Sequence, residues 1–429
     1  NIKIDFKFYY TLYIVSNGLK KISDAKKYLE KCLKIDNKNY IVLNNLANIF
    51  LKEGNFDKAE SFYLKSLDFK KDYLLATINI AILYQNLGKF EQSKKYYLRA
   101  IELSPKKISL YFNLSRIDNN FIDEKKIKFL INLLNNEEKE LSEKSFGYFL
   151  LAAYERKKQN FKLEIDYLKK ANKFNFEAMK FANEKTLEYW KNIIIKQYQN
   201  FKFVNEKKNK YLNNLKPIFI IGLPRSGSTI TEVLLRKNND ISSLGEISIF
   251  NGTIAKGFTK TDNNEIDLNY VNNTILDMLT EKNFDFKKKF FIDKSLENFF
   301  YIDVILKVFP NAKFVNTTRN IEDNIFAIYK QSLGKLSWTH SIENILEYID
   351  NYFVVMNYFT KKYPNKIFSL NLEKLTNNSK ELVKKLYDFC DLEWSDKVLD
   401  FHSKKDLFIS TASNIQVRNK IKKYDINQY

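Results

Sequence analysis

The segment best suited to chemistry is the turn GLPRSGST at residues 222–229. A short β-branched apolar run precedes it, and a helical pattern follows it. Its glycines have the spacing of the phosphate loop G-x-x-x-x-G-K-[ST], but a serine stands at the lysine position. Backbone N–H groups in such a turn, together with the start of the following helix, bind anions. The residues expected to contact the anion are Gly222, Pro224, Arg225, Ser226, Gly227, Ser228 and Thr229.

The lysine that this turn lacks limits which nucleotide it can hold. In the full phosphate loop that lysine contacts the β- and γ-phosphates of a nucleoside triphosphate. A turn without it suits a nucleotide that carries one phosphate followed by a less charged group, with the planar guanidinium of Arg225 as the contact for that group. A nucleoside triphosphatase and a glycine-serine turn that binds nothing are the two alternatives.

Three further segments have the pattern of strands that end in polar residues, at 288–294, 312–320 and 366–375. Helical patterns alternate with these strands, at 321–333, 341–361 and 379–390. Such alternation implies a parallel sheet covered by helices on its faces. Ligands bind at the carboxyl ends of the strands in such sheets. The polar residues that end these strand-like segments are therefore expected at the ligand-binding edge of the sheet.

The N-terminal part of the chain repeats itself every 34 residues. Ala25, Ala59 and Ser93 have this spacing, and so do Gly54 and Gly88. The sequence around them has the pattern of helix–turn–helix units, with small residues that let paired helices approach each other closely. This pattern resembles the tetratricopeptide repeat, with about three units over residues 7–106.

The helical pattern continues beyond the strict repeats. We expect residues 1–173 to form the repeat array, with divergent last units that cover its exposed end. Residues 174–215 are a polar helical connector, and residues 216–429 form the α/β domain. The predicted fold is therefore a helical solenoid followed by a phosphate-loop-like α/β domain with a parallel sheet.

A resemblance to a known family rests on the segment PIFIIGLPRSGST, which begins at Pro217. It is similar to the 5′-phosphosulfate loop of the sulfotransferase family. With helical repeats in front, the chain resembles the branch related to the tyrosylprotein sulfotransferases. The similarity is strong over residues 1–106 and 216–335 and weaker towards the C-terminus. It implies 3′-phosphoadenylyl sulfate as the donor and requires no metal.

The resemblance assigns two catalytic residues outside the turn. In the family, a Gly–Glu pair follows the loop, and its glutamate acts as the base on the acceptor hydroxyl; Glu246 stands in that position. A positioned carboxylate of this kind is usually worth about 10²–10⁴ in rate. Lys294, in the segment FFIDKSLENF, matches the lysine that stabilises the leaving phosphate, and Leu296 replaces a family proline.

The same resemblance assigns the contact for the 3′-phosphate. Arg319 matches the family's arginine, whereas Ala327 stands where the family has a serine eight residues later. A hydroxyl contact to the phosphate is therefore expected to be lost, and Asn324 and Tyr329 are the candidate substitutes.

The segment STASNIQVR near the C-terminus resembles the family's closing segment. Ser413 would lie near the transferred sulfuryl group and complete the catalytic set with Glu246, Arg225 and Lys294. Gln416 and Arg418 would lie beside the nucleotide. The family continues into a tail with a tryptophan, which this chain lacks before Tyr429.

The composition argues against several other classes. A formal charge of +20 would suit a nucleic-acid binder, but only seven of the 71 basic residues are arginine and the lysines are dispersed. Two cysteines cannot build a disulfide framework and fit a cytoplasmic protein. No apolar stretch is long enough for a transmembrane helix. The two histidines are isolated, so no metal site is expected. Because the chain begins at Asn1, a preceding targeting segment stays open.

The sequence therefore predicts a sulfotransferase that moves a sulfuryl group from 3′-phosphoadenylyl sulfate to an acceptor hydroxyl. A protein tyrosine, presented to the site by the repeat array, is one candidate acceptor. Carbohydrate and small-molecule hydroxyls are the others. The rival from another class is a non-catalytic repeat scaffold with a decayed nucleotide-binding domain. A small-molecule or nucleotide kinase is the enzyme rival, and the absent loop lysine counts against it.

Overall fold

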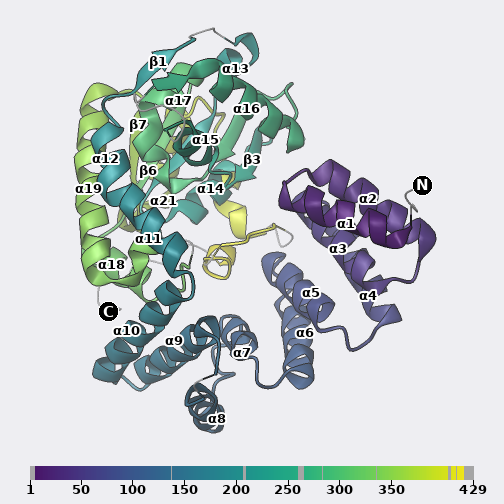
Figure 1. Cartoon of the computed structure of the whole chain (residues 1–429). Helices are drawn as coiled ribbons and strands as arrows, with labels where there is room; N and C mark the ends of the chain where they lie inside the picture. The colour runs from purple at the N-terminus through teal and green to yellow at the C-terminus, as the bar shows by residue number, and fades with distance from the viewer. Residues whose placement is uncertain are drawn as a thin grey trace. The chain divides into compact units, whose positions relative to one another are not determined.

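The structure is a computed structural model that describes residues 5–136, 138–205, 209–258, 265–282, 284–334, 336–403, 407–411 and 413–419. Contacts divide the chain into two compact units, which Figure 1 shows and which we describe one at a time. The first unit comprises residues 1–139 and 405–410, and the second comprises residues 140–404 and 411–429. The predicted boundaries at residues 173 and 215 stay predictions, since contacts alone define these units.

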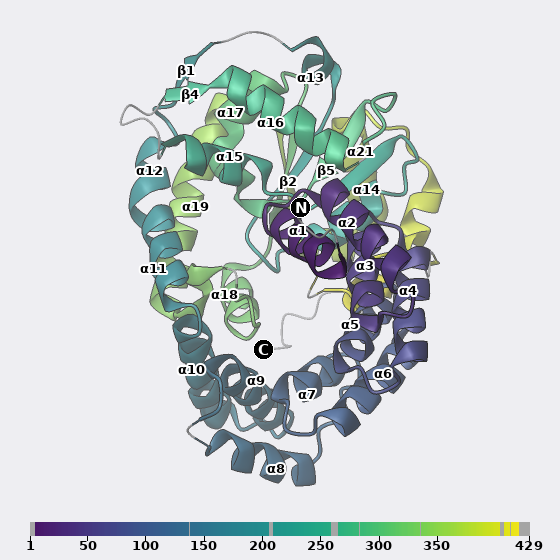
Figure 2. The ribbon, with the colours of Figure 1, turned by 45° about the vertical axis from the view of Figure 1, so that its right-hand side comes forward.

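The first unit is built from consecutive helical hairpins. Helices α3 and α4, and then α5 and α6, stand side by side in Figure 2. The helices are α1 (Phe6–Gly18), α2 (Ile22–Ile35), α3 (Tyr40–Lys52), α4 (Phe56–Phe69), α5 (Leu74–Asn86), α6 (Phe90–Leu103), α7 (Ile108–Ser115) and α8 (Glu124–Leu134). This arrangement confirms the predicted helical solenoid.

Small residues of the 34-residue period occupy the contacts between paired helices. Ala25, Ala59 and Ser93 are completely buried in α2, α4 and α6. The Ser93 hydroxyl donates to the carbonyl of Ala81 in the partner helix at 2.8 Å, which a larger side chain would prevent. The repeat spacing in the sequence therefore marks the positions where two backbones approach each other.

The turn inside each hairpin needs a left-handed residue. Gly54 and Gly88 have φ angles of +76° and +77°, and Lys20 takes the equivalent position in the first hairpin with φ +60°. The amide that follows each of them bonds to the carbonyl five residues earlier, for example Asn55 N to Phe50 O at 2.9 Å. This is the Schellman arrangement that closes a helix at its C-terminus, and glycine is favoured in it.

We expect Gly54→Ala to lower the free energy of unfolding by about 1 kcal/mol, because a Cβ is disfavoured at positive φ. A Cβ at this position would meet no atom within 4 Å, so the cost is purely conformational. Gly18→Ala is the matched control, since Gly18 is equally open but has no positive φ. Urea unfolding followed by circular dichroism measures both. Equal stability of the two variants would contradict this account of the turn.

A short C-terminal segment belongs to the repeat unit. The ring of Phe408 stacks on Phe56 at the start of α4, with centroids 4.3 Å apart and planes 9° apart. The amide of Ile409 donates to the carbonyl of Asn86 at 2.9 Å, and the Ile409 side chain is buried. Residues 407–410 thus pack against the second and third hairpins, and we call them the C-terminal strap.

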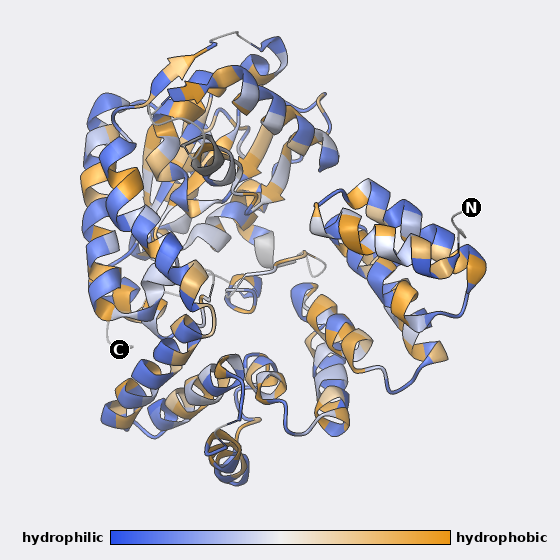
Figure 3. Ribbon diagram, viewed as in Figure 1, coloured by the Kyte–Doolittle hydropathy of each residue, from blue (hydrophilic) through white to orange (hydrophobic). Residues whose placement is uncertain are grey.

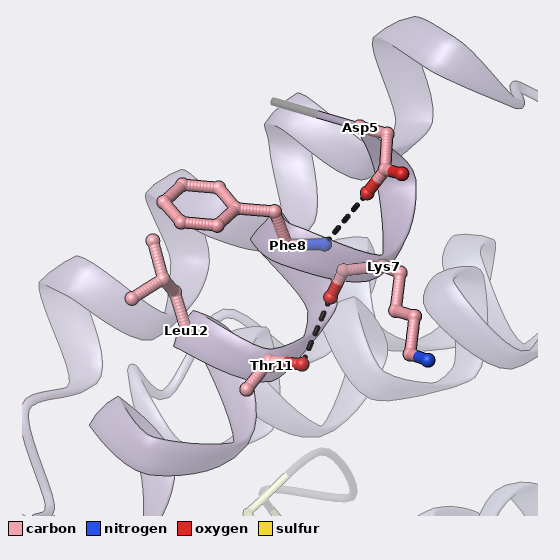
Figure 4. A pocket seen from close by; sticks show the side chains of 5 residues that line it. All are labelled: Asp5, Lys7, Phe8, Thr11 and Leu12. Atoms are coloured by element: carbon pink, nitrogen blue, oxygen red, sulfur yellow. Dashed lines mark hydrogen bonds between the residues drawn. The ribbon is translucent and has the colours of Figure 1, made fainter. Parts of the chain in front are cut away.

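The first helix of the repeats carries a shallow depression, shown in Figure 4. The Asp5 carboxylate accepts from the amide of Phe8 at 3.0 Å and caps the helix. The hydroxyl of Thr11 donates to the carbonyl of Lys7 at 2.9 Å. These polar groups are used within the helix, so the depression is a feature of its surface rather than a site for the predicted chemistry.

The second unit begins with another hairpin, α9 (Leu141–Lys157) and α10 (Phe161–Glu177). Gln159 stands in its turn with φ +60°, and the amide of Asn160 bonds to the carbonyl of Glu155 at 3.0 Å. The turn geometry of the repeats therefore recurs here without a glycine. Further helices follow: α11 (Lys180–Glu188), a π-helical turn (Tyr189–Ile193), α12 (Ile194–Gln197) and α13 (Lys210–Asn214).

A parallel five-stranded sheet forms the centre of the second unit, in the order β3-β5-β2-β6-β7. All of its neighbouring strands run parallel, which confirms the predicted parallel sheet. The strands are β2 (Ile218–Gly222), β3 (Ile241–Gly245), β5 (Phe290–Asp293), β6 (Lys313–Thr318) and β7 (Ile367–Asn371). A separate two-stranded sheet pairs β1 (Lys202–Val204) with β4 (Glu265–Asp267).

Helices follow the strands and cover the sheet. They are α14 (Ser228–Leu235), α15 (Ile249–Phe258), α16 (Leu268–Glu281), α17 (Ile302–Val308), α18 (Ile321–Tyr329), α19 (Ile342–Lys362), α20 (Leu372–Asn377) and α21 (Ser379–Phe389). Short 3₁₀ helices span Leu296–Tyr301, Ser337–His340, Asp396–Ser403 and Gln416–Arg418. Helix α19 carries both hydropathy colours along its length in Figure 3, as expected of a helix with one buried and one exposed side.

The core of the sheet is largely aromatic. Phe219 of the central strand β2 contacts the rings of Phe250, Phe291 and Phe314, with centroid distances of 5.5–6.2 Å. Burying a side chain of this size contributes roughly 1.5–3 kcal/mol. The packing of Phe219 therefore holds the central strand β2 in the core. Because the turn directly follows β2, its position is fixed as well.

Two sequence-based expectations for this unit needed correction. The predicted strand 366–375 ends at Asn371, because the Asn371 carboxamide accepts from the Lys374 amide at 2.9 Å and starts a helix there. Strand β3 was not predicted, since ISSLG has little apolar character. Among the residues described, no helix is both long and apolar enough to cross a membrane.

Candidate active site

The predicted anion-binding turn lies between the central strand β2 and helix α14. Gly222 (φ +128°), Arg225 (φ +67°) and Gly227 (φ +101°) all have left-handed backbone conformations. A Cβ on Gly222 would lie 2.5 Å from the carbonyl oxygen of Thr317, because β2 and β6 pair at this level. The turn therefore needs glycine where the two strands meet. Alternation of right- and left-handed residues gathers backbone N–H groups into a concave anion site.

Neighbouring side chains hold the carbonyl groups of the turn. The Ser226 hydroxyl donates to the carbonyl of Leu223 at 2.6 Å. The Asn324 carboxamide donates to the carbonyl of Pro224 at 2.8 Å, and the Arg319 guanidinium donates to the carbonyl of Arg225 at 3.4 Å. Because one of these carbonyls is bound from within the turn and two are bound by side chains outside it, the turn keeps its shape. The first amides of α14, from Ser228 on, have no partner within the helix and are oriented for an anion.

The Arg225 side chain links the turn to the C-terminal segment. Its guanidinium donates to the Ser413 hydroxyl at 2.5 Å and to the Gln416 carboxamide oxygen at 3.1 Å. The Thr229 hydroxyl pairs with that of Thr411 at 3.2 Å. Arg225 is thus brought into contact with Ser413 and Gln416, two other residues assigned to this site from the sequence, which lie 188 and 191 positions later in the chain.

Arg418 lies in the same C-terminal turn and donates to the carboxamide oxygen of Asn414 at 2.8 Å. The structure places it beside Gln416 and gives its guanidinium a local partner. The predicted absence of a family-like tail concerns residues after Asn419, which lie outside the described part of the chain.

Arg319 follows strand β6 and lies against the turn. Its side chain is 9% exposed, and it approaches Asp323 at 3.9 Å as well as the carbonyl of Arg225. One guanidinium therefore contacts the backbone of the turn and a carboxylate of α18. Arg319 therefore lies against the turn, and its predicted contact with a 3′-phosphate stays a prediction.

In this chain, alanine takes the place of the family serine in helix α18. Ala327 is buried in α18, with 1% of its surface exposed. Asn324 already uses its carboxamide on the turn. The Tyr329 phenol is buried, and burial together with the charge of Glu343 raises its pKa. Asn324 is therefore already engaged at the turn, and a replacement of the serine by Asn324 or Tyr329 stays a prediction.

Lys294 and Glu246 form a close pair. The Lys294 ammonium donates to the Glu246 carboxylate at 2.5 Å and lies 3.6 Å from Glu232 of α14. The lysine side chain is 2% exposed, whereas that of Glu246 is 59% exposed. Lys294 directly follows strand β5, and the Lys294 amide donates to the carbonyl of Gly245 at 2.9 Å. The cation is thus held in place, while its carboxylate partner is reachable by a substrate.

Further carboxylates lie close to this lysine. Asp293 is completely buried, and burial raises its pKa to about 6 although Ser295 and Asn298 donate to it. Burial also raises the pKa of Glu297, with further contributions from the charges of Glu246 and Asp293. The end of β5 therefore combines one buried cation with several carboxyl groups, which is an arrangement suited to proton transfer and charge stabilisation.

Some residues of the site were missed by the sequence analysis. Glu232 contacts both Lys294 and the Ser243 hydroxyl, the latter at 2.6 Å. The Thr317 hydroxyl pairs with that of Ser226 at 2.7 Å. Both are ordinary residues inside regular elements, so only the register of the sheet and helix reveals them.

Among the described residues, no three His, Cys, Asp or Glu side chains lie together so that they could hold a metal ion. His340 is buried, its Nδ1 lies 3.5 Å from the Asn172 carboxamide oxygen, and burial lowers its pKa to about 4. It is therefore a neutral packing residue.

Comparison with known proteins agrees with the predicted fold class. Residues 217–396 match the sulfotransferase family, and residues 18–73 and 77–107 match tetratricopeptide repeats. The chain therefore carries a sulfotransferase-family domain behind tetratricopeptide repeats. The matched domain includes the turn, Glu246, Lys294 and Arg319, whereas Ser413 and Gln416 lie after it.

The relatives are distant. An uncharacterized protein of Aquifex aeolicus is 24% identical over 332 residues, which cover 71% of this chain but only 42% of that protein. A putative protein-tyrosine sulfotransferase of Caenorhabditis briggsae is 23% identical over 231 residues, or 48% of this chain and 77% of that protein. A Mycobacterium tuberculosis sulfotransferase, STF1, aligns in structure over 69% of this chain and 98% of its own, with 11% identity and a TM-score of 0.32.

Proposed function

We propose that this protein transfers a sulfuryl group from 3′-phosphoadenylyl sulfate to an acceptor hydroxyl. The observation that carries the proposal is the convergence of Arg225, Ser413 and Gln416 at the turn, beside Arg319. The turn offers backbone amides for one phosphate, and the guanidinium of Arg225 offers a fork for the sulfuryl oxygens. The match to the sulfotransferase family supports this assignment.

In the proposed reaction the acceptor oxygen attacks sulfur, and the bond between sulfur and the bridging oxygen of the donor breaks. Glu246 takes the proton of the acceptor hydroxyl. Lys294 stabilises the negative charge that develops on the bridging oxygen, which leaves with adenosine 3′,5′-bisphosphate. Arg225 and Ser413 stabilise the sulfuryl oxygens. The products are a sulfate ester and the bisphosphate, so atoms and charge balance without a further reactant.

The pairing of Lys294 with Glu246 supports this division of roles. The attacking and leaving oxygens of an in-line transfer lie on opposite sides of one sulfur atom, a few ångströms apart. A base and a cation 2.5 Å from each other can therefore serve the two oxygens with only small side-chain movements. The exposure of Glu246 gives the acceptor access, and the burial of Lys294 strengthens its electrostatic effect.

For the acceptor we favour a tyrosine side chain of a polypeptide. The relative described as a putative protein-tyrosine sulfotransferase supports this choice, and so do the repeats, since such arrays bind peptides. A carbohydrate or small-molecule hydroxyl is the alternative, and an acceptor panel with donor-product release as the readout separates the two. A scaffold without activity is the rival from another class.

The test of the proposed donor is calorimetric titration with adenosine 3′,5′-bisphosphate and, separately, ATP. We expect the wild type to bind the bisphosphate and not ATP, because the turn lacks the lysine for β- and γ-phosphates. Arg319→Ala should weaken bisphosphate binding by roughly ten- to a hundredfold, the value of one charge-assisted phosphate contact.

Adenosine 5′-phosphate is the matched ligand control, because it lacks the 3′-phosphate. Arg319→Ala should leave its binding nearly unchanged. Equal weakening of both ligands would assign Arg319 to the turn rather than to the 3′-phosphate. No binding of the bisphosphate by the wild type would overturn the proposed function and favour a scaffold.

A further inference from the structure

The buried ammonium of Lys294 has a second carboxylate beside it that the proposed reaction does not use. Glu232 Oε2 lies 3.6 Å from the Lys294 Nζ, and Glu246 Oε1 lies 2.5 Å from the same nitrogen. The two carboxylates differ in their surroundings, since the Glu232 side chain is 9% exposed and that of Glu246 is 59% exposed. One partner of the lysine can therefore reach a substrate, whereas the other stays buried.

The Glu232 carboxylate is held by contacts that do not involve the lysine. The Ser243 hydroxyl donates to Glu232 Oε1 at 2.6 Å. The Arg236 guanidinium, one turn further along α14, lies 3.9 Å from the same oxygen. These two contacts engage Oε1, so that Oε2 is the oxygen next to Lys294. The orientation of Glu232 is therefore set independently of Lys294.

Glu232 also connects three elements that build the active site. It belongs to α14, the helix that starts in the anion-binding turn. Ser243 lies in β3, three residues before Glu246, and β3 pairs with β5 at Ser243 and Ile292. Lys294 directly follows β5. The Glu232 carboxylate thus ties the position of Lys294 to the helix whose first amides are oriented for an anion.

A second carboxylate matters because the proposed reaction takes Glu246 away from Lys294. Glu246 turns to the acceptor hydroxyl and becomes neutral when it takes the proton. A buried ammonium without a counter-ion is strongly disfavoured, so a lysine with Glu246 as its only partner would tend to follow it. Glu232 takes no part in the proton transfer, and its negative charge therefore remains beside the lysine throughout.

We propose that Glu232 is a positioning residue for Lys294, the fixed counter-ion that keeps the ammonium directed at the leaving oxygen while Glu246 serves the acceptor. This inference rests on the proposed function. In this role Glu232 touches neither the donor nor the acceptor and acts only through Lys294. Its loss should therefore slow the transfer step and leave donor binding almost unchanged.

The test compares Glu232→Gln with the wild type in single-turnover release of labelled adenosine 3′,5′-bisphosphate from 3′-phosphoadenylyl sulfate, with a tyrosine-containing peptide as acceptor. Glutamine keeps the shape of the side chain and an acceptor for Ser243 but removes the charge. We expect the rate to fall by about ten- to a hundredfold, the effect of misplacing a catalytic group by about 1 Å. The Kd of the bisphosphate, measured by calorimetric titration, should change by less than about threefold.

A double-mutant cycle with Lys294→Met separates this role from a structural one. If Glu232 acts through the lysine, adding Glu232→Gln to Lys294→Met should lower the rate by less than about twofold, because residues that act as a unit have non-additive effects. A glutamate needed only for the fold would lower the rate by the same factor in both backgrounds.

A second variant and a control complete the set. Ser243→Ala keeps both charges but releases Glu232 Oε1, so it should lower the rate by about three- to tenfold, in line with the loss of one hydrogen bond. This loss should also disappear in the Lys294→Met background. Glu381→Gln is the matched control, since it removes a glutamate of α21 that is 57% exposed and pairs with Lys385. It should transfer at the wild-type rate.

A rate of Glu232→Gln within about threefold of the wild type, additive losses in the cycle, or an equal loss of bisphosphate affinity would each overturn this inference and leave the proposed function intact. A wild type that neither binds the bisphosphate nor releases it from the donor would overturn both. The wild type alone therefore distinguishes the two failures.

Discussion

Lys294→Met is expected to reduce the rate of sulfuryl transfer by about 10²–10³-fold, since one fixed charge on a developing anion is commonly worth roughly 3–4 kcal/mol. Lys294 is 2% exposed and lies at the end of β5, so water cannot easily replace it. Methionine keeps the length of the side chain and removes the charge. The measurement is single-turnover release of labelled adenosine 3′,5′-bisphosphate from the donor, with a tyrosine-containing peptide as acceptor.

The control is Lys287→Met, which removes an exposed charge close to the start of the same strand. It should leave the rate unchanged. Bisphosphate affinity of Lys294→Met should change much less than the rate, because the lysine acts chiefly on charge that develops during the reaction. A rate within threefold of the wild type would contradict the role proposed for Lys294.

The second large effect concerns stability. Gly222→Ala should lower the free energy of unfolding by about 3–5 kcal/mol, the combined cost of overpacking and of an unfavourable φ. Its Cβ would lie 2.5 Å from the carbonyl oxygen of Thr317, which belongs to a strand and cannot move aside like a flexible side chain. Urea unfolding followed by tryptophan fluorescence reports this change, because Trp190, Trp338 and Trp394 all belong to the second unit.

Gly252→Ala is the matched control in the same unit. Gly252 lies in α15, a Cβ there would meet no atom within 4 Å, and its φ is not positive. Alanine should raise stability there by up to about 1 kcal/mol through its helix propensity. If Gly222→Ala were as stable as the wild type, β2 and β6 would not approach each other as described.

The elements could be predicted from the sequence where a regular pattern marks them. The 34-residue period marks buried contacts such as Ala59 and Ser93, because two helices can approach only at small residues. The strands β2 and β6 are apolar runs with polar ends. Strand β3 lacked such a pattern, and Asn371 stops β7 through a helix cap that propensity alone does not reveal.

The parts of the site that lie within one short segment could be predicted from the sequence, and the parts that join distant segments could not. The spacing of Gly222 and Gly227 predicts the turn. The contacts of Arg225 with Ser413 and Gln416 join segments far apart in the chain, and only the family resemblance suggested them.

The C-terminal strap affects how this protein could be recombined in evolution. The repeat unit is not one continuous stretch, since residues 405–410 return to it after the sulfotransferase-family domain. A gene fusion that moved only residues 1–139 would leave Phe56 without the stacked ring of Phe408. The rest of the chain, left without residues 1–139, would carry an unpacked Phe408 a few residues before Ser413. We therefore expect the repeats and the domain to be inherited together rather than exchanged as separate modules.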